Sequence, residues 1–328
     1  MSNIPVSIAC GPYDRMAAIA DGRVKIEGVD ATYIAIQSGP EIFRRMIKNQ
    51  EFDISEMSAS TYLSARTKGG FPFVAIPVFP SKVFRHGYVF INKRSGIEKP
   101  ADLAGRRVGM MGYQQTAAVW IRGMLQEDYG VDLRSVQWLD GGSDAPFSGG
   151  GKDVEIPQGI TIEVVPNNIA MSDLLAAGEI DAMLGARRPA SFGKSPNVVR
   201  LFPNYRGVER DYYRRTGIFP IMHTLVIREE LHAKHPWLAS SLFKAFTQAK
   251  AAADRDMRFS GAVKYALPWL LDDIDEIDEL FGGDPFCYGL EENRASLEAL
   301  ARYLRDQGFV GRTINIDNIF APILSEHL

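Results

Sequence analysis

The sequence predicts an α/β fold with two lobes, in which two mixed sheets are joined by crossing strands. Apolar segments of strand length alternate with segments of helical period, a pattern that favours mostly parallel sheets. The middle of the chain contains one complete small α/β series, flanked by two halves of another. We therefore expect residues 1–92 and 219–328 to form lobe 1 and residues 93–218 to form an inserted lobe 2. Ligands of such folds bind at the carboxyl ends of strands, here in a cleft between the lobes.

Apolar segments rich in β-branched residues predict the sheet of lobe 1. They are Val6–Ala9, Ala31–Ile36, Asp53–Met57, Phe73–Phe79, Tyr88–Asn92 and Ile218–Ile227, of which the last two are expected to cross between the lobes. Pro72, Pro77 and Pro80 put the fourth segment at a sheet edge or limit its length, because proline lacks the N–H that a ladder needs. Helices are predicted over Glu41–Lys48, Trp237–Arg255 and Glu291–Gln307, where apolar residues recur on one face.

Residues 107–129 have the pattern of a strand, a glycine loop and a helix, and the prediction of lobe 2 begins from them. Thr116 is expected to cap the helix. A helix that starts after a strand exposes unpaired N–H groups and the positive end of its dipole, so it can bind an anion. Tyr113, Gln114 and Gln115 in the loop suit a small polar ligand. The alternative is an ordinary strand–loop–helix connection with a packing tyrosine.

The rest of lobe 2 follows from shorter patterns. Strands are predicted at Val136–Leu139, Ile160–Val165 and Ile180–Leu184. Between the last two, Ser172 is expected to cap a short helix that Gly178 ends. Residues 141–159 are rich in glycine and have no period, which predicts a surface loop.

Composition limits the class of protein. Of the 328 residues, 46% are hydrophobic and 23% charged, which is normal for a soluble globular protein. The net charge of −3 gives no broad basic surface for nucleic acid. Cys10 and Cys287 are too few for a disulfide framework or a zinc spacing. We find no membrane-spanning run and no secretory signal, so we expect a cytoplasmic protein; assembly as a homo-oligomer stays open.

Several longer stretches, in order along nearly the whole chain, carry a family resemblance. They include YDR at 13–15, EMSASTYL at 56–63, IPVFPSKVFRHG at 76–87, QTAAVWIRGML at 115–125, RRTGIFPIMH at 214–223 and DPFCYGLEENR at 284–294. Through them the chain resembles the 4,5-dihydroxyphthalate decarboxylase family, whose members have the fold of type 2 periplasmic binding proteins. Two features depart from the family pattern: Arg188, where a proline is expected, and the glycine-rich loop at 141–159. Both bear on the substrate.

The resemblance implies that the chain converts 4,5-dihydroxyphthalate to protocatechuate and CO2 without an organic cofactor. The ring carbon that loses CO2 cannot simply carry an anion. A deprotonated hydroxyl para to the departing carboxylate pushes electron density onto that carbon, which an acid protonates before CO2 leaves. The protein must therefore supply a base, an acid, and cations or N–H groups for the carboxylates.

Three residues are candidates for the proton chemistry. His86 is the first choice, because an imidazole titrates near neutral pH; its alternative is a hydrogen-bonded structural histidine. Asp14 would donate a proton or pair with His86, or else cap a turn. Glu56 lies beside apolar Met57, so burial would raise its pKa enough for it to act as an acid. The alternative for Glu56 is a helix-start carboxylate that interacts with the dipole.

The candidates for substrate binding are cations and hydrogen-bonding side chains. Arg85 and Arg187 would hold carboxylates, because a guanidinium offers two parallel hydrogen bonds. Arg122, farther along its helix, is expected at the surface or between the lobes. The remaining candidates are Tyr13, Ser58, Tyr113, Gln115, Thr116 and His223, the last with a satisfied core histidine as its alternative. No HExxH, CxxC or P-loop pattern occurs, and no metal site is predicted.

Two other functions stay open. The first is a solute-binding protein or sensor for an aromatic carboxylate. It would use the same arginines and the same N–H groups at helix starts, and it needs no acid/base pair. A related enzyme with another substrate is the second, because Arg188 and the 141–159 loop depart from the family pattern.

Overall fold

The computed structural model describes residues 3–144, 158–166 and 168–324, and its chain forms two compact units. The first unit comprises Met1–Lys82, Ile221–Leu297 and Asn315–Leu328. The second comprises Val83–Pro220 and Glu298–Ile314. The second unit is thus inserted into the first, and it also contains residues 83–92, 219–220 and 298–314, which the sequence assigned to lobe 1. The cleft expected between the lobes stays a prediction.

The sheet of the first unit is mixed. Its strands are β1 (Ile4–Cys10), β2 (Val29–Ala35), β3 (Ile54–Ser58), β4 (Phe73–Lys82) and β11 (Ile221–Arg228), in the order β2-β1-β3-β11-β4. β1 runs parallel to β2 and β3, whereas β11 runs antiparallel to β3 and β4. The proline-containing β4 lies at the edge, as its sequence predicted. β3 lies in the middle, which matters for the site below.

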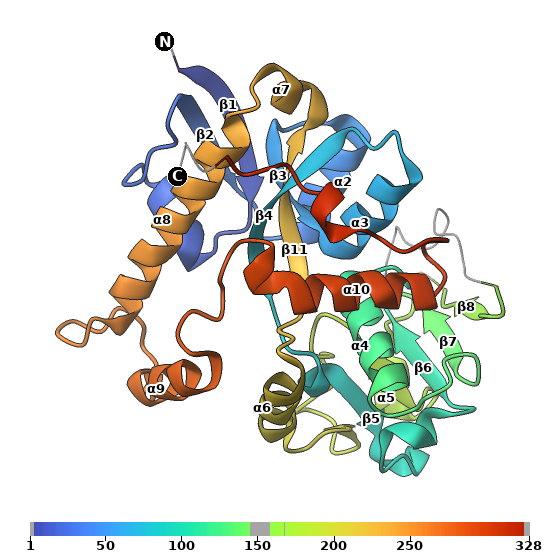
Figure 1. The fold of residues 1–328 in the computed structure, drawn as a ribbon. Coiled ribbons are helices and arrows are strands. Elements are labelled where there is room, and N and C mark those ends of the chain that lie inside the picture. The colour runs from blue at the N-terminus through green and yellow to red at the C-terminus, as the bar shows by residue number, and fades with distance from the viewer. Residues whose placement is uncertain (1–2, 145–157, 167, 325–328) are drawn as a thin grey trace. The chain divides into compact units, whose positions relative to one another are not determined.

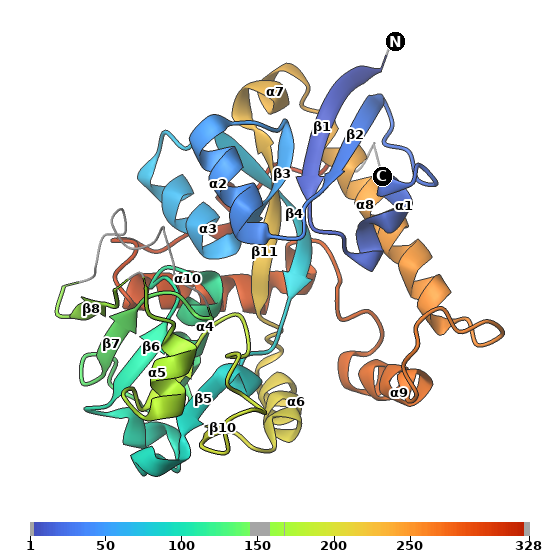
Figure 2. The same ribbon diagram turned by 180° about the vertical axis from the view of Figure 1, so that it is seen from behind.

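Helices cover both faces of this sheet (Figures 1 and 2). The covering helices are α1 (Ala17–Ala20), α2 (Gly39–Asn49), α3 (Ala59–Lys68), α7 (Glu229–Lys234) and α8 (Leu238–Arg258). α9 (Leu270–Phe281) lies away from the sheet, and short 3₁₀ turns lie at Asp14–Met16, Glu291–Asn293 and Ile316–Asn318. The apolar stripe of α8, including Leu242 and Phe246, packs on Ile8, Ile76 and Leu225 of the sheet. Each such fully buried side chain contributes about 2 kcal/mol of transfer free energy.

The second unit has a six-stranded sheet with four parallel strands. It consists of β5 (Val89–Asn92), β6 (Arg107–Met110), β7 (Gln137–Asp140), β8 (Ile162–Val164), β9 (Ala182–Leu184) and β10 (Val198–Arg200), in the order β10-β5-β9-β6-β7-β8. β9, β6, β7 and β8 are parallel, while β5 is antiparallel to β9 and β10. The helices are α4 (Thr116–Glu127), α5 (Met171–Ala177), α6 (Tyr205–Thr216) and most of α10 (Arg294–Asp306), and 3₁₀ turns lie at His86–Tyr88, Lys93–Ser95 and Pro100–Leu103.

Two expected helix caps are wrong. The N-cap residue of α4 is Gln115, which makes no side-chain capping hydrogen bond, and Thr116 is already helical. Ser172 lies inside α5, where its hydroxyl donates to the hydroxyl of Ser191 instead of capping. A cap needs a non-helical backbone, which the residue type alone does not set. Gly178 does end α5, with a φ of 84° that favours glycine.

Helix α4 is buried on all sides from Thr116 to Leu125. Part of this burial comes from α10, which follows much later in the chain. The rings of Trp120 and Tyr303 meet edge to face at 5.4 Å and 87°. Gly123 allows this approach, because a Cβ at that position would overlap the ring of Tyr303.

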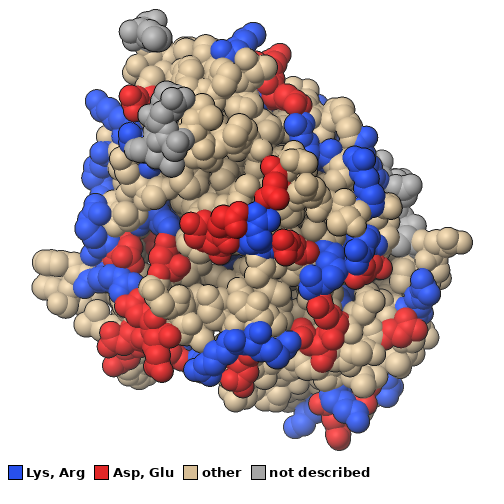
Figure 3. Space-filling model, in the orientation of Figure 1, with Lys and Arg blue, Asp and Glu red and all other residues tan. Residues whose placement is uncertain are grey.

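Charged side chains of both signs are interspersed on the molecular face in Figure 3, in keeping with the small net charge of −3. That face shows no broad basic patch, and the prediction that the chain binds no nucleic acid stays a prediction. None of the helices in the described residues is both long enough and apolar enough to cross a bilayer.

We predict that Gly123→Ala destabilises the protein by about 2 kcal/mol, because the added methyl forces Tyr303 out of its position. Urea unfolding followed by circular dichroism measures the change. Gly311→Ala is the matched control: nothing lies within 4 Å of its Cβ position, and it belongs to the same unit. Equal stability of the two variants would contradict the close packing of α4 against α10.

Candidate functional site

The carboxylate of Glu56, in the first unit, is buried and accepts several hydrogen bonds. Its side chain is fully buried in the middle of β3. Oε2 accepts hydrogen bonds from the N–H of Gly11 at 2.8 Å and the thiol of Cys10 at 3.5 Å. Oε1 accepts from the hydroxyl of Tyr13 at 2.6 Å and lies 2.5 Å from Nδ1 of His223. Four groups from two other strands and one loop therefore converge on one carboxylate.

The sheet topology explains this convergence. β1 and β3 are parallel neighbours, so their carboxyl ends meet at the same edge of the sheet. The loop after β1 brings Gly11 and Tyr13 to that edge. A Cβ at Gly11 would lie only 2.6 Å from the ring of Tyr13, so a larger residue there would displace the ring that donates to Glu56. From the other side, β11 pairs antiparallel with β3 and sets His223 opposite Ser58.

The imidazole of His223 is held on two sides. Glu56 binds Nδ1, which leaves Nε2 for a ligand, and 22% of the side chain is exposed. The ring meets Phe43 of α2 edge to face, with centroids 5.0 Å apart. A Cβ at Gly39 would lie 3.5 Å from Cε1 of the imidazole, so the start of α2 also abuts the ring. An imidazole oriented by a buried carboxylate can take up and return a proton at its outer nitrogen.

The pKa of Glu56 is lowered from its ordinary value. Burial alone would raise it, but the imidazole of His223, the hydroxyl of Tyr13 and the N–H of Gly11 together outweigh burial. The expectation that burial would raise this pKa and make Glu56 an acid is therefore wrong. Burial and the neighbouring carboxylate raise the pKa of Tyr13 above its usual range, so Tyr13 stays a phenol that donates to Glu56.

Two other predicted residues of this unit have local roles. Ser58 caps α3, and its hydroxyl accepts from the N–H of Thr61 at 3.4 Å. Asp14 is exposed; it accepts from the N–H of Arg15 at 2.7 Å and pairs with the same guanidinium at 3.0 Å. Asp14 lies inside the 3₁₀ turn Asp14–Met16, whose N-cap is Tyr13 and has no side-chain capping hydrogen bond, so the turn-capping alternative for Asp14 is wrong. The role of Asp14 in proton transfer stays a prediction.

His86 lies in the second unit, where it is 1% exposed. Its ring is surrounded by Tyr129, Phe202 and Tyr212, at centroid distances of 6.2, 5.4 and 5.2 Å. Neither ring nitrogen has a hydrogen-bond partner within the described residues. Burial, with a smaller effect of the Arg215 charge, lowers the pKa of His86 to about 4. A neutral imidazole in apolar surroundings is a weak base, so the geometry supports His223 better as the proton carrier.

The two predicted carboxylate ligands differ in exposure. Arg85 is 4% exposed, donates to the carbonyl of Ala186 at 3.4 Å, and lies over the ring of Tyr88 at 4.9 Å. Burial lowers the pKa of Arg85 to about 10, which still leaves it a cation at neutral pH. Arg187 is exposed, and it follows the residue whose carbonyl Arg85 binds. The roles of both arginines in carboxylate binding stay predictions.

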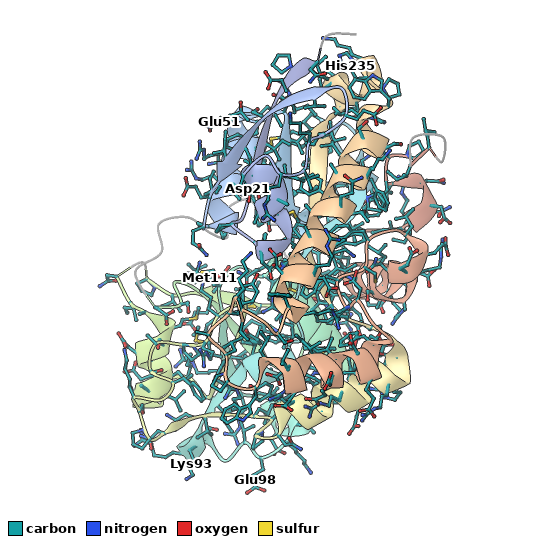
Figure 4. All side chains as sticks on the ribbon, turned by 90° about the vertical axis from the view of Figure 1, so that its left-hand side faces the viewer. Asp21, Glu51, Lys93, Glu98, Met111 and His235 are labelled. Atoms are coloured by element: carbon teal, nitrogen blue, oxygen red, sulfur yellow. The ribbon has the colours of Figure 1, made fainter. Side chains whose placement is uncertain are left out.

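The predicted ligand loop follows β6 and begins at Met111 (labelled in Figure 4). Because β9, β6 and β7 are parallel neighbours, their carboxyl ends share one edge. Three buried oxygens close to that edge have no hydrogen-bond partner within the described residues: Oη of Tyr113, Oε1 of Gln115 and Oγ of Ser143. Buried polar atoms are nearly always satisfied in native proteins, so these oxygens are suited to a polar ligand. Thr116 is buried at the start of α4 beside them.

Arg122 packs against this loop through Tyr113. It is fully buried, so the expectation of a surface position is wrong, and its partners Tyr113 and Gln307 belong to the second unit, as Arg122 itself does. Its guanidinium lies 3.7 Å from the centroid of the Tyr113 ring, donates to the carbonyl of Tyr113 at 2.5 Å, and donates to the side chain of Gln307 at 2.9 Å. Sequence reasoning missed this residue because Gln307 comes 185 positions later. On the other side, the carboxylate of Asp140 accepts from the N–H of Gly112 at 2.7 Å.

Glu56, Tyr13 and His223 were each candidates from the sequence, but no sequence pattern predicted that they lie together. Glu56 and His223 are 167 positions apart, and only the pairing of β3 with β11 brings them together. Cys10, Gly39 and Phe43, which complete the surroundings, carried no signal of chemistry. Within the described residues, no group of three or more His, Cys, Asp or Glu side chains is placed to hold a metal ion.

Comparisons with known proteins give both sequence relatives and fold relatives. The chain is 38% identical to the 4,5-dihydroxyphthalate decarboxylase of Comamonas testosteroni over 323 residues, which covers 98% of each chain. It is 38% identical to the 4,5-dihydroxyphthalate decarboxylase of Pseudomonas putida over 215 residues, 65% of this chain and 83% of that one. The family model described as an ABC transporter, phosphonate, periplasmic substrate-binding protein matches residues 28–150.

Solved structures of low sequence identity show the fold. The periplasmic aliphatic sulphonate binding protein SsuA from Escherichia coli matches with a TM-score of 0.56 at 12% identity, covering 98% of each chain. The alkanesulfonate-binding protein SsuA from Xanthomonas axonopodis pv. citri, bound to MOPS, matches with a TM-score of 0.55 at 11% identity, covering 98% of this chain and 99% of that one. The predicted periplasmic-binding-protein-like fold with two mixed α/β sheets is confirmed.

We predict that His86→Phe makes the protein less sensitive to acid. The folded-state pKa of about 4 lies below the ordinary 6.5, so the unfolded chain binds the extra proton first and stability falls as pH drops through this window. This residue alone accounts for a loss of about 2 kcal/mol between about pH 8 and about pH 5, which the variant lacks. Urea unfolding at the two pH values measures the difference.

The control is Tyr129→Phe, which changes the same aromatic cluster without a group that titrates in this range; burial raises the pKa of Tyr129 to about 12. It should keep the acid sensitivity of the parent chain. Equal pH dependence of the parent and His86→Phe would show that His86 is not buried as a neutral ring.

Proposed function

This chain belongs to the 4,5-dihydroxyphthalate decarboxylase family, and we propose that it decarboxylates a hydroxylated aromatic diacid, with 4,5-dihydroxyphthalate as substrate and protocatechuate and CO2 as products. The observation that carries the proposal is the buried Glu56 carboxylate 2.5 Å from Nδ1 of His223. The relatives at 38% identity support the choice of substrate. As a carboxy-lyase, the chain would act in phthalate degradation; a cytoplasmic location stays the prediction made from the sequence.

Decarboxylation of such a ring is a problem of proton placement. When the hydroxyl para to the departing carboxylate loses its proton, electron density rises at the carboxylated ring carbon. That carbon then takes a proton, the ring loses aromaticity, and the bond to the carboxylate breaks to release CO2 and restore the ring. The group that delivers the proton must hold it firmly in the resting state and release it to carbon.

His223 is suited to that delivery. Its outer nitrogen, Nε2, would carry the proton, while Glu56 fixes the ring through Nδ1 and stabilises the imidazolium before transfer. Tyr13 and the N–H of Gly11 keep Glu56 ionised by donating to it. Glu56 therefore acts through His223 as a positioning residue, and Phe43 restricts the ring from the side. Arg85 and Arg187 remain the proposed cations for the substrate carboxylates, since guanidinium groups bind carboxylates with two hydrogen bonds.

The second candidate is a solute-binding protein or sensor for an aromatic carboxylate. Two observations favour it: two solved structures of similar fold are named as sulphonate-binding proteins, and three buried oxygens near the loop after β6 have no hydrogen-bond partner among the residues that the structure describes. Such a protein needs no oriented imidazole. The pairing of Glu56 with His223 is therefore the feature that separates an enzyme from a binder.

We predict that His223→Asn lowers kcat for 4,5-dihydroxyphthalate by at least about a hundredfold, the range expected when a general acid is lost. Release of CO2 from the purified protein measures turnover, and calorimetric titration with the diacid measures binding, which should persist. His232→Asn is the matched control in the same unit and should keep full activity. Running His86→Phe beside them decides between the two imidazoles. Full activity of His223→Asn would reject the assignment, and binding without turnover by the parent chain would favour the binder.

We predict that Glu56→Gln keeps the substrate KM within about threefold and lowers kcat by roughly 10- to 100-fold, because the imidazole loses its orienting counter-charge. Tyr13→Phe should give a smaller loss in the same direction, since it removes one donor to Glu56. Circular dichroism at the assay temperature controls for folding. A KM that rises with kcat unchanged would mean that Glu56 binds substrate and does not position His223.

A further inference from the structure

Lys82 and Cys287 form a pair that the proposed activity does not use. Lys82 is the last residue of β4 and only 4% exposed. Its ammonium donates to the carbonyls of Pro285 and Cys287, at 3.2 and 3.1 Å, and lies 3.6 Å from the sulfur of Cys287. Cys287 is a free, half-buried cysteine. The pair joins two of the stretches that carry the family resemblance, at 76–87 and 284–294.

Holding the loop does not require a cysteine. The two carbonyls already bind the ammonium, and a thiol sulfur is a weak acceptor beside them. The contact does, however, bring a nucleophilic nitrogen close to an oxidisable sulfur within one unit of the chain. Backbone pairing fixes the approach, because the N–H of Gly289 donates to the carbonyl of Pro77 at 2.9 Å and holds this segment along β4.

We propose that Lys82 and Cys287 are joined by a reversible sulfur–nitrogen bond when hydrogen peroxide oxidises Cys287. The thiolate attacks peroxide, the O–O bond breaks, and the products are a sulfenic acid and hydroxide. The sulfur is oxidised by two electrons and the peroxide is reduced by two. The amine of Lys82 then attacks that sulfur, the S–OH bond breaks, and the departing hydroxide leaves as water with one amine proton. Excess thiol reductant reverses the link and regenerates amine and thiol, with a disulfide as the other product.

The surroundings of Lys82 favour an attacking amine. Burial lowers the pKa of Lys82 to about 8, so part of the population is uncharged near neutral pH. The charged and titratable groups that act on it are Cys287 and Asp284, which oppose the decrease, and Lys250, which adds to it. Cys10 offers a natural contrast, because it is fully buried, bonded to Glu56, and has its pKa raised by burial. We therefore expect Cys10 to resist peroxide.

The link would fix a segment beside the candidate site. Lys82 pairs with Ile221 of β11, and the neighbouring Ser81 pairs with His223. A bond from Lys82 to Cys287 would tie the 284–290 segment to that edge strand and remove one positive charge from the pair. Because the atoms are already 3.6 Å apart, bond formation requires a small approach of two side chains.

The experiment treats the whole purified chain with a small excess of hydrogen peroxide, blocks free thiols, digests it with trypsin and identifies peptides by mass spectrometry. We expect a peptide pair linked through Lys82 and Cys287, lighter than the sum of the two free peptides by two hydrogens, and absent after thiol reduction. Its yield should rise from about pH 7 to about pH 9, as the amine loses its proton.

Two variants serve as controls. Lys82→Arg keeps the charge but offers no comparable nucleophile, so Cys287 should progress to sulfinic acid instead of forming the link. Cys287→Ser should give no linked peptide at all. The proposal is overturned if the parent chain shows only sulfinic or sulfonic acid at Cys287, if the linked peptides have any other mass, or if Lys82→Arg oxidises with the same products as the parent chain.

Discussion

The buried carboxylate of Glu56 is the constraint on which the first unit depends. A buried charge without partners costs several kcal/mol, so the fold must deliver donors to it. Those donors come from the end of β1, the loop after it, and β11, and each arrives only if the strand order β1-β3-β11 is correct. The correct pairing of the strands is therefore also the condition for assembling the candidate site. A shift of β11 by one residue would turn His223 to the other face of the sheet and leave Glu56 without its main counter-charge.

The second unit also depends on a buried charged group with several partners, in this case a positive one. Arg122 is fully buried and satisfied by Gln307, the carbonyl of Tyr113 and the face of the Tyr113 ring. Through Gln307, which also donates to the carbonyl of Val119, the last part of the chain is joined to the loop after β6. The all-round burial of α4 and the shape of that loop thus depend on one guanidinium that a single-helix pattern assigns to the surface.

The parts of this structure that were predictable from sequence are those that local patterns determine. Apolar segments and helical periods predicted the α/β class and most strands, and prolines predicted that β4 lies at an edge. The predictions that were wrong concern features that depend on residues distant in the chain. The caps at Thr116 and Ser172 need backbone angles that tertiary packing sets. The predicted direction of the pKa shift of Glu56 was wrong because its partners Tyr13 and His223 are distant in the chain. From the local sequence, burial was the only effect that could be recognised.

The two histidines show how surroundings decide chemistry. Both rings are packed by aromatic side chains, Phe43 at one and Tyr129, Phe202 and Tyr212 at the other. The ring at position 223 has a carboxylate oxygen 2.5 Å from Nδ1, and its side chain is partly exposed. An imidazolium at position 86 has the repulsion of Arg215 and, among the described residues, no hydrogen-bond partner. Of the two histidines, His223 is the one whose ring is in contact with a carboxylate, and that contact is the feature the proposed proton transfer would use.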